Sequence, residues 1–463
     1  MSTIFADGWL ITMNDEREVL EEASICVEKD RIVAIGTRDG LVRSHPQAEV
    51  IDCRGRIVMP GMVNTHTHLF QTLLKGLGDD MALKDWFTCM TGPSAVHLTP
   101  ADSKAAALHG CVESLRSGVT TLVDFNYVHT QAGMAEAAIE AFEETGIRGF
   151  VCRGFMTTGE AYDVPRQLIE TPEQAIAGAR SLIERQNRTL GRVRAGIAPC
   201  MIWTVEEKAL RLARALADET GALLTTHVAE TTFELEEANR RYGRTDTEFL
   251  GDIGFLGPDV LAVHCVHCSS RDIRVLKYHG AKVSHNPCSN LYLASGVPPI
   301  PEMHASGLTV GLGSDGPASS NNHSLFQAMK FAALIHKGVH RDATIMTAEK
   351  VLEMATIDGA RAVGLAGEIG SIEIGKKADI VVVDCSGPFM TPVHNPVSAL
   401  VYSALGSEVS DVMVDGRFVI RDGAVVSVDE GAVRTAAQSH ADALAKRAGS
   451  ERFKKRGWRS VAV

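Results

Sequence analysis

Residues 57–68 read Ile-Val-Met-Pro-Gly-Met-Val-Asn-Thr-His-Thr-His, a short apolar run that ends in two histidines. Before this stretch the chain consists of brief β-branched segments bounded by turn residues, as at 24–28, 31–36 and 48–52. After it, apolar runs alternate with segments of helical periodicity. The stretch therefore marks the point where a β-rich domain gives way to a repeated strand–helix pattern.

Eight apolar runs follow one another in this second part of the chain. Most are apolar on both faces, as expected of parallel strands that are covered on both sides. Their predicted ends are near His66, Asp124, Arg153, Cys200, His227, His264, His285 and Asp315. Helical patterns lie between them, at 101–115, 135–144, 172–186 and 206–218. Eight such units predict an α/β fold of the (β/α)8 TIM-barrel class, with the strand ends gathered at one mouth.

The two ends of the chain are expected to form a second, smaller domain. After a predicted helix at 347–365, β-rich segments return at 370–384 and 411–419, and a polar helix is predicted at 429–447. Together with the N-terminal strands they would make a discontinuous β-sandwich domain. The predicted boundaries are 1–57 and 366–463 for the small domain and 58–365 for the barrel.

Composition limits the classes of partner. The chain has 463 residues and a net charge of −11, which disfavours nucleic-acid binding because phosphate contacts need clustered Lys and Arg. Its ten cysteines show no framework spacing, and no stretch approaches the roughly 20 apolar residues of a membrane span. The N-terminus shows no secretory signal. We expect a cytoplasmic protein whose partner is a small molecule.

The strand ends carry a set of residues that suits a metal ion. His66 and His68 are two apart, so both side chains project to the same face of a strand. A lone His-X-His is more often structural, but here His227 and Asp315 follow strands of the same predicted barrel. Three imidazoles and one carboxylate suit zinc, and iron(II) is a second possibility. The fourth strand contains no lysine to bridge two metals, which favours one divalent ion.

Three strand-end residues are candidates for proton transfer. Glu230 lies three residues after His227. The alternative to a catalytic role is that Glu230 is a solvated carboxylate at the start of a helix. Asp315 precedes a glycine and could instead be a turn residue. His264 directly follows an apolar run, so we favour it over the nearby His267. Asp315 could take a proton from a metal-activated water, Glu230 could deliver one to the substrate, and His264 could orient the water.

These motifs, in this order, resemble those of the amidohydrolase superfamily, and specifically its cytosine/guanine deaminase and triazine hydrolase branch, which includes atrazine chlorohydrolase and melamine deaminase. The resemblance rests on the segments 60–68, 117–121, 227–230, 264–267, 284–290 and 313–316. It implies one ion held by His66, His68, His227 and Asp315, with Glu230, His264 and Asp315 moving protons. It also implies a homo-oligomer acting on a heterocyclic substrate.

Three residues are candidates for substrate binding. Gln71 resembles the glutamine with which guanine-type deaminases hold the base edge, although it could equally cap a local loop. Trp203 could stack on a flat ring or pack in the core. Arg153 could donate to a ring carbonyl, while an arginine at a strand end is more often an ion-pair residue.

The resemblance leaves the substrate open. We rank first the hydrolytic deamination of a free base of the isocytosine, guanine or cytosine type, with release of ammonia. Second is displacement of chloride or an amine from an s-triazine. A methylthioadenosine or S-adenosylhomocysteine-type nucleoside ranks third, because Pro93-Ser94-Ala95 lacks the expected acid and Cys200 stands where a histidine is expected. A non-catalytic scaffold ranks last, since the ligand set is intact.

Overall fold

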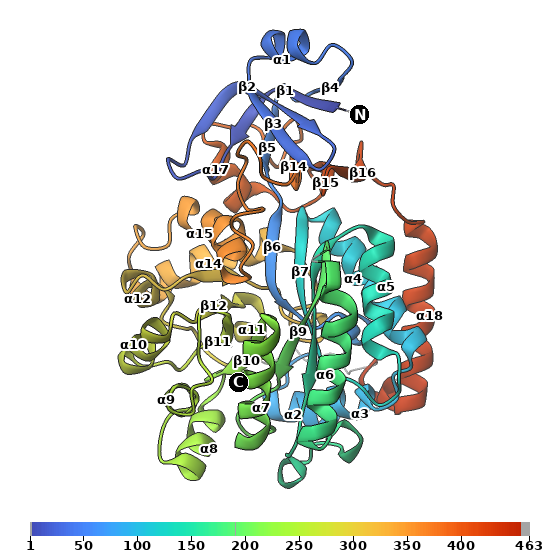
Figure 1. Ribbon diagram of the computed structural model, residues 1–463, viewed down its shortest axis with the longest axis vertical. Coiled ribbons are helices and arrows are strands. Elements are labelled where there is room, and N and C mark those ends of the chain that lie inside the picture. Colours follow the sequence, from blue (N-terminus) through green and yellow to red (C-terminus); the bar gives the residue numbers. More distant parts are fainter. Residues whose placement is uncertain (1, 190, 455–463) are drawn as a thin grey trace, which may run out of the picture.

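The computed structural model describes residues 2–189 and 191–454, and its centre is a ring of parallel strands (Figure 1). The eight strands are β6 (Met62–Thr67), β7 (Val119–Asn126), β8 (Arg148–Phe155), β9 (Val193–Pro199), β10 (Leu224–Val228), β11 (Val260–His264), β12 (Lys282–His285) and β13 (Val310–Leu312). Each pairs in parallel with the next along the chain. Beyond β13, the Asp315 amide donates to the His66 carbonyl oxygen at 3.0 Å, which brings the last strand back to the first. The predicted barrel is confirmed.

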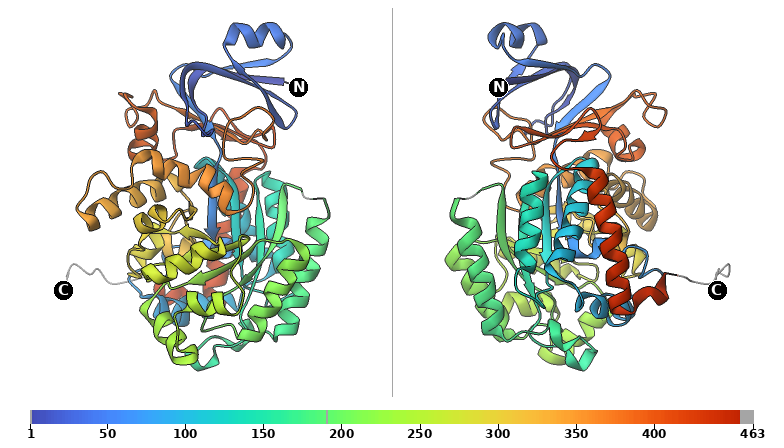
Figure 2. Two further views of the ribbon diagram at one scale, coloured as in Figure 1. Left: turned by 60° about the vertical axis from the view of Figure 1, so that its left-hand side comes forward. Right: turned by 90° about the vertical axis from the view of Figure 1, so that its right-hand side faces the viewer.

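Helices cover the outside of this barrel (Figures 1 and 2). The longer ones are α4 (Pro100–Arg116), α5 (Met134–Thr145), α6 (Pro172–Gln186), α7 (Glu207–Thr220), α8 (Thr232–Tyr242), α10 (Ser270–His279) and α14 (Leu325–His340). Helices α4 and α6 each begin with a capping box, in which the N-cap threonine is followed by a proline at the first helical position. Gly146 and Gly221 end α5 and α7 in the left-handed conformation, which glycine adopts without a steric penalty.

Shorter helices fill the loops at the two ends of the barrel. They are α2 (Leu83–Trp86), α3 (Gly92–Ala95), α9 (Asp246–Asp252), α11 (Pro287–Tyr292), α12 (Ile300–Ala305), α13 (Pro317–Ser320), α15 (Ala348–Ala355) and α16 (Ile357–Ala362). The single helix predicted at 347–365 is wrong. Thr356, at φ −122° and ψ −95°, leaves helical geometry and separates α15 from α16.

A nine-stranded mixed sheet forms the second unit, at the top of Figure 1. Its strands are β1 (Ser2–Ile11), β2 (Val19–Glu28), β3 (Arg31–Gly36), β4 (Glu49–Asp52), β5 (Arg56–Pro60), β14 (Ile380–Asp384), β15 (Val409–Val414), β16 (Arg417–Arg421) and β17 (Ala424–Val425), with helix α1 (Arg38–Ser44) at its edge. The antiparallel pairing of β5 with β14 joins the two ends of the chain. The fold class is therefore confirmed.

Two features near the chain ends bear on how the units meet. Sheet pairing continues to Pro60, where the chain passes into β6. Helix α18 (Glu430–Ala448) lies along α4 on the side of the barrel, away from the small sheet (Figure 2), and the short helix α17 (Pro396–Ser398) precedes β15.

Among residues 2–189 and 191–454, no helix is both long and apolar enough to cross a membrane.

Candidate metal centre and active site

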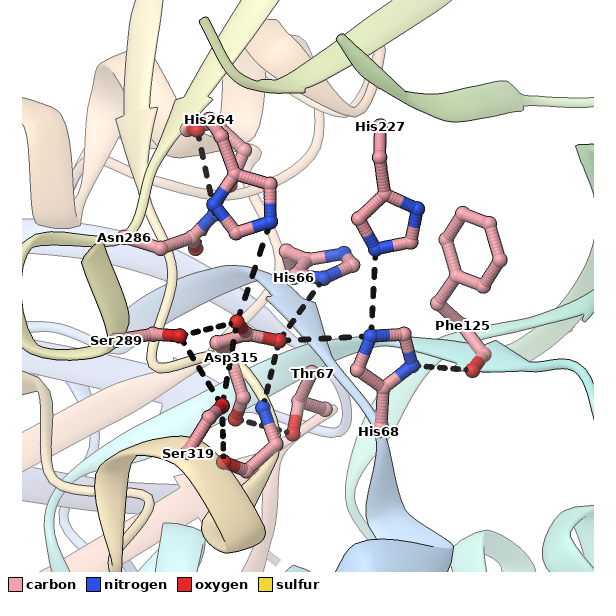
Figure 3. A network of polar contacts seen from close by, with 12 residues as sticks. His66, Thr67, His68, Phe125, His227, His264, Asn286, Ser289, Asp315 and Ser319 are labelled. Atoms are coloured by element: carbon pink, nitrogen blue, oxygen red, sulfur yellow. Dashed lines mark hydrogen bonds and ion pairs between the residues drawn. The ribbon is translucent and has the colours of Figure 1, made fainter. Parts of the chain in front are cut away.

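Four histidines and one aspartate meet where the strands end (Figure 3). His66 and His68 come from β6 and its end, His227 from β10, His264 from β11, and Asp315 from the loop after β13. Ligand atoms of His66, His68 and His227 all lie within 4.8 Å of one another, as do those of His66, His264 and Asp315. All five residues are buried. The parallel strands thus bring together residues that are far apart in the sequence.

The spacing of the ligand atoms fits one tetrahedral ion. Two ligand atoms about 2.0–2.1 Å from a tetrahedral metal lie about 3.4 Å apart. Nε2 of His68 is 3.4 Å from Nε2 of His227, and also 3.4 Å from Oδ1 of Asp315. Nε2 of His66 is 3.2 Å from the same carboxylate oxygen. These four side chains are the predicted ligand set, and the three distances have the length that a tetrahedral metal site requires.

Backbone and amide oxygens fix how the imidazoles face the centre. Nδ1 of His68 lies 2.8 Å from the Phe125 carbonyl oxygen, and Nδ1 of His227 lies 2.7 Å from that of Cys200. Since a carbonyl oxygen only accepts, each Nδ1 carries the proton and each Nε2 presents a lone pair. Burial lowers the pKa of His68 to about 3 and that of His227 well below its usual value. Both rings are therefore neutral and ready to bind a cation.

Asp315 is held as an ionised carboxylate. Burial by itself would raise its pKa, but the contacts with His66, His264 and His68 hold that pKa well below the usual range. The Ser289 hydroxyl donates to its Oδ2 at 2.6 Å. A negative ligand offsets part of the charge of a divalent ion.

Glu230 lies beside this cluster in a different protonation state. Burial, together with the nearby Asp315 charge, raises the pKa of Glu230 to about 8. Its Oε2 is 3.5 Å from Nε2 of His264, whose Nδ1 lies 2.8 Å from the Asn290 side-chain oxygen. Glu230 is thus a protonated acid and Asp315 an ionised base at the same centre. Glu230 can therefore donate a proton on one side of a substrate, while Asp315 accepts a proton on the other side.

A largely apolar cavity opens onto these groups. It is lined by His68, Gln71, Leu83, Trp86, Phe87, Tyr127, Cys200, Met201, Trp203, His227, Glu230, His264, Leu293, Asp315 and Ser319. The structure thus places Gln71, in the 3-10 helix η1 (Leu69–Leu74), and Trp203, in the loop after β9, at the cavity. The Gln71 amide is fully buried at the cavity wall, where it can hydrogen-bond with the Tyr127 hydroxyl. A ligand can use the remaining donor and acceptor capacity of the amide.

The prediction for Arg153 is wrong. Its guanidinium group makes a two-nitrogen ion pair with Glu170, at 2.9 and 2.7 Å, and contacts the Ala175 carbonyl oxygen at the start of α6. It lines a separate surface hollow near Gly178 rather than the cavity. Arg153 points out of the barrel toward α6, and it stabilises the connection between β8 and that helix.

Two further strand-end histidines have structural contacts. His267 Nε2 lies 2.9 Å from the Ser295 carbonyl oxygen, which agrees with the structural role expected for it. His285 packs outward against His336 of α14, with their Nε2 atoms 3.4 Å apart. Sequence reasoning missed several lining residues, among them Tyr127, Met201 and Leu293. Their only signal was position in the loops after predicted strands.

Comparisons with known proteins agree with this geometry. The model of the amidohydrolase family matches residues 57–419. The 5-methylthioadenosine/S-adenosylhomocysteine deaminase of Acetivibrio thermocellus is 36% identical over 94% of this chain and 97% of its own. The 5'-deoxyadenosine deaminase of Methanosarcina mazei is 38% identical, over 96% and 99%.

Among solved structures, a zinc-bound adenosine deaminase from Xanthomonas campestris superposes with a TM-score of 0.89 and 27% identity, covering 96% of this chain and 98% of its own. Atrazine chlorohydrolase from Arthrobacter aurescens, solved with zinc, has a TM-score of 0.88 and 25% identity, covering 95% and 100%. The family match spans most of the chain and includes every residue of the cluster. The chain belongs to the amidohydrolase family and is a hydrolase of C–N bonds.

Proposed function

We propose that the chain hydrolytically deaminates the adenine ring of an adenosine derivative altered at its 5' carbon, such as 5'-deoxyadenosine or 5'-methylthioadenosine, with release of ammonia. The observation that carries the proposal is the protonated Glu230 beside His264, at the end of an apolar cavity that also holds ionised Asp315. The names of the curated relatives support this substrate class. From the sequence alone, a nucleoside substrate ranked third. We therefore revise the order that placed a free base first.

One divalent ion, which we propose to be zinc, would be held by His66, His68, His227 and Asp315. The two convergent groups share His66, which favours a single ion, and zinc accompanies the two solved relatives. Such an ion would supply a water activated at neutral pH and polarise the reacting centre.

The chain's own groups carry the protons. Asp315 takes a proton from the attacking water, whose oxygen adds to the amine-bearing carbon, and Glu230 gives its proton to the adjacent ring nitrogen. His264 orients the water and stabilises charge at the reacting carbon. The tetrahedral carbon then loses its amine, which leaves as ammonia with the proton held by Asp315. The hydroxyl proton returns to Glu230, and the product keeps a carbonyl and a ring N–H.

A free base or an s-triazine is the second candidate, and a specific observation favours it. Glu230 and Asp315 are the only carboxylates among the described residues that line the cavity, and both belong to the metal centre. No lining acid is left for ribose hydroxyls, and Ala95, where the family resemblance implies an acid, is a buried apolar residue. The buried Gln71 amide, which lines the cavity, suits a ring that presents adjacent N–H and C=O groups.

Ammonia release by the zinc-loaded protein separates the candidates. The panel comprises 5'-deoxyadenosine, 5'-methylthioadenosine, isocytosine, guanine, cytosine and melamine, each followed as kcat/KM. We expect turnover of at least one nucleoside at a rate well above that of every free base. Faster turnover of a base or of melamine would contradict the nucleoside proposal and establish the second candidate.

A further inference from the structure

A second compartment lies outside the cavity, on the side away from the metal ligands. Its walls include Tyr162, at the end of the 3-10 helix η3 (Glu160–Tyr162), Trp203 and Phe233 of α8. Leu83 and Leu293 also belong to the walls and, with Trp203, line the inner cavity as well. We call these five residues the aromatic vestibule. The other residues that line the compartment are Ala82, Lys84, Thr231, Thr232, His267, Ala294 and Ser295. Because three of the walls are shared, the vestibule continues the cavity outward.

The three rings of the vestibule form one packed cluster. The ring centroids of Tyr162 and Trp203 are 5.6 Å apart, those of Trp203 and Phe233 are 5.7 Å apart, and those of Tyr162 and Phe233 are 5.5 Å apart. Their planes meet at 74–78°, the edge-to-face arrangement that aromatic rings prefer. Three different loop regions of the barrel thus supply a preformed apolar surface.

Arginines fix this cluster from behind. The Arg241 guanidinium donates to the Trp203 carbonyl oxygen and to the Tyr162 hydroxyl, at 3.3 Å each. Arg240 donates to the same hydroxyl at 3.2 Å. Both arginines also pair with the carboxylate of Glu237, which is buried in α8. The vestibule is therefore built and anchored without a ligand.

The charge around the vestibule disfavours a cationic occupant. The described residues that line this compartment include no aspartate or glutamate that could pair with a cation. The Lys84 amine already lies 5.8 Å from the Phe233 ring centre, and the Arg241 guanidinium carbon lies 5.6 Å from that of Tyr162. A second cation would meet two like charges.

One buried donor lies where the two compartments join. Trp203 is 3% exposed, and its indole N–H makes no hydrogen bond within the described part of the chain. A buried donor without a partner costs free energy, which a ligand acceptor can recover. An indole group that lines both compartments can therefore contact a ligand extending from one into the other.

Resting on the proposed function, we infer that the aromatic vestibule binds a neutral apolar substituent, of the alkyl or alkylthio class, that projects from the substrate held in the inner cavity. Thioether sulfur makes favourable contacts with ring edges, which the edge-to-face cluster presents. Phe233 is half-buried on the outer side of the vestibule, so it contacts the substituent and not the reacting ring.

The test compares 5'-methylthioadenosine with 5'-deoxyadenosine, which differ only in the methylthio group. We expect Phe233→Ala to lower kcat/KM for the methylthio compound roughly tenfold, mainly through KM, and to leave the deoxy compound unchanged. Phe233→Leu should retain most of the preference. Tyr278→Ala, which removes an aromatic side chain that is 86% exposed on α10, is the matched control and should change neither substrate. An unchanged ratio in Phe233→Ala overturns the inference.

Failure of the proposed function gives a different result. If the zinc-loaded wild type turns over neither adenosine, the nucleoside proposal is wrong. The vestibule is then tested with melamine and N-ethylmelamine by calorimetric binding to the wild type and to Phe233→Ala. Tighter binding of the ethyl compound that is lost in Phe233→Ala supports the inference. Equal affinities, or binding of neither compound, overturn it.

Discussion

Glu230 is the residue on which the proposed proton delivery depends. Glu230→Gln keeps the size and polarity of the side chain but removes the proton that the buried acid gives to the ring. We expect kcat to fall by roughly 10²–10⁴-fold, the usual contribution of a general acid, while metal content stays unchanged. Steady-state ammonia release and elemental analysis measure the two quantities.

Glu236→Gln makes the same chemical change on the exposed face of α8 and is the control for Glu230→Gln. It should leave kcat within twofold of the wild type, on the order expected for a surface change. Full activity of Glu230→Gln would exclude the carboxyl group as proton donor. Loss of metal in that variant would instead place Glu230 among the ligands.

His227 tests the ligand set. Its Nε2 lies 3.4 Å from Nε2 of His68, and the Cys200 carbonyl oxygen holds its Nδ1. We expect His227→Ala to lose most of its zinc after dialysis. We also expect a chelator to lower the melting temperature of the wild type but not that of the variant, because only a bound ion stabilises the fold.

His97→Ala removes an exposed histidine and is the control for His227→Ala. It should keep zinc and the chelator response of the wild type. Retention of stoichiometric zinc by His227→Ala would contradict the proposed coordination.

The metal-site residues were predictable because parallel strands end at the same face of a barrel. The ends of the apolar runs located His227 and Asp315 without knowledge of distances. The prediction that Arg153 binds substrate was wrong, and the reason is also physical. Both faces of β8 are buried, so the pattern of apolar residues does not tell which side chains face the mouth and which face the helices.

At the scale of elements, Asp102 joins two helices. It is the third residue of α4 and closes the capping box, in which the Thr99 amide donates to its Oδ2 at 2.9 Å. The same carboxylate, 1% exposed, accepts from His440 and Arg447 of α18 at 2.7 and 2.5 Å. We expect Asp102→Ala to lower the free energy of unfolding by about 2–4 kcal/mol, since a cap and the partners of a buried charge are lost together. It should also expose α18 to limited proteolysis.

The α6 capping box supplies the control for Asp102→Ala. Gln174→Ala removes an equivalent contact to the Thr171 amide, but at an exposed position with no second helix attached. It should cost about 1 kcal/mol or less and leave α18 protected. Urea unfolding measures both variants. Equal losses in their free energy of unfolding would show that the contact with α18 does not stabilise the fold.

Element boundaries were predictable where the chain carries its own start and stop residues. α6 was predicted at the bounds it has, because Thr171-Pro172 begins it with a cap. The break at Thr356 has no proline or glycine to announce it, so tertiary packing decides it. Strand β1 was missed because its pairing with β2, β4 and β5 is long-range and leaves no regular alternation in Ser2–Ile11.

At the scale of the whole molecule, a buried ion network connects the barrel to the small sheet. Arg148, the first residue of β8, donates to Asp379 at 2.7 and 3.0 Å and to Asp415 at 3.0 Å. Both acids belong to the C-terminal part of the chain, at the start of β14 and after β15. The network thus stabilises the position of the sheet whose strand β5 leads into the histidine-bearing β6.

Arg148→Met keeps the length of the side chain and leaves Asp379 buried without its partner. We expect a loss of about 3–5 kcal/mol in the free energy of unfolding at pH 7. Arg180→Met, which breaks an exposed pair with Glu219, is the control and should cause a much smaller loss. Burial alone would raise the pKa of Asp415, but Arg148 and Lys377 lower it. A lowered folded-state pKa adds stability that is present above the unfolded value, about 3.9, and is lost as the pH falls through the folded value. The wild type should therefore lose more stability than Arg148→Met between pH 5 and pH 3, and urea unfolding across that range measures the difference. Parallel curves for the two proteins would show that the network contributes no pH-dependent stability.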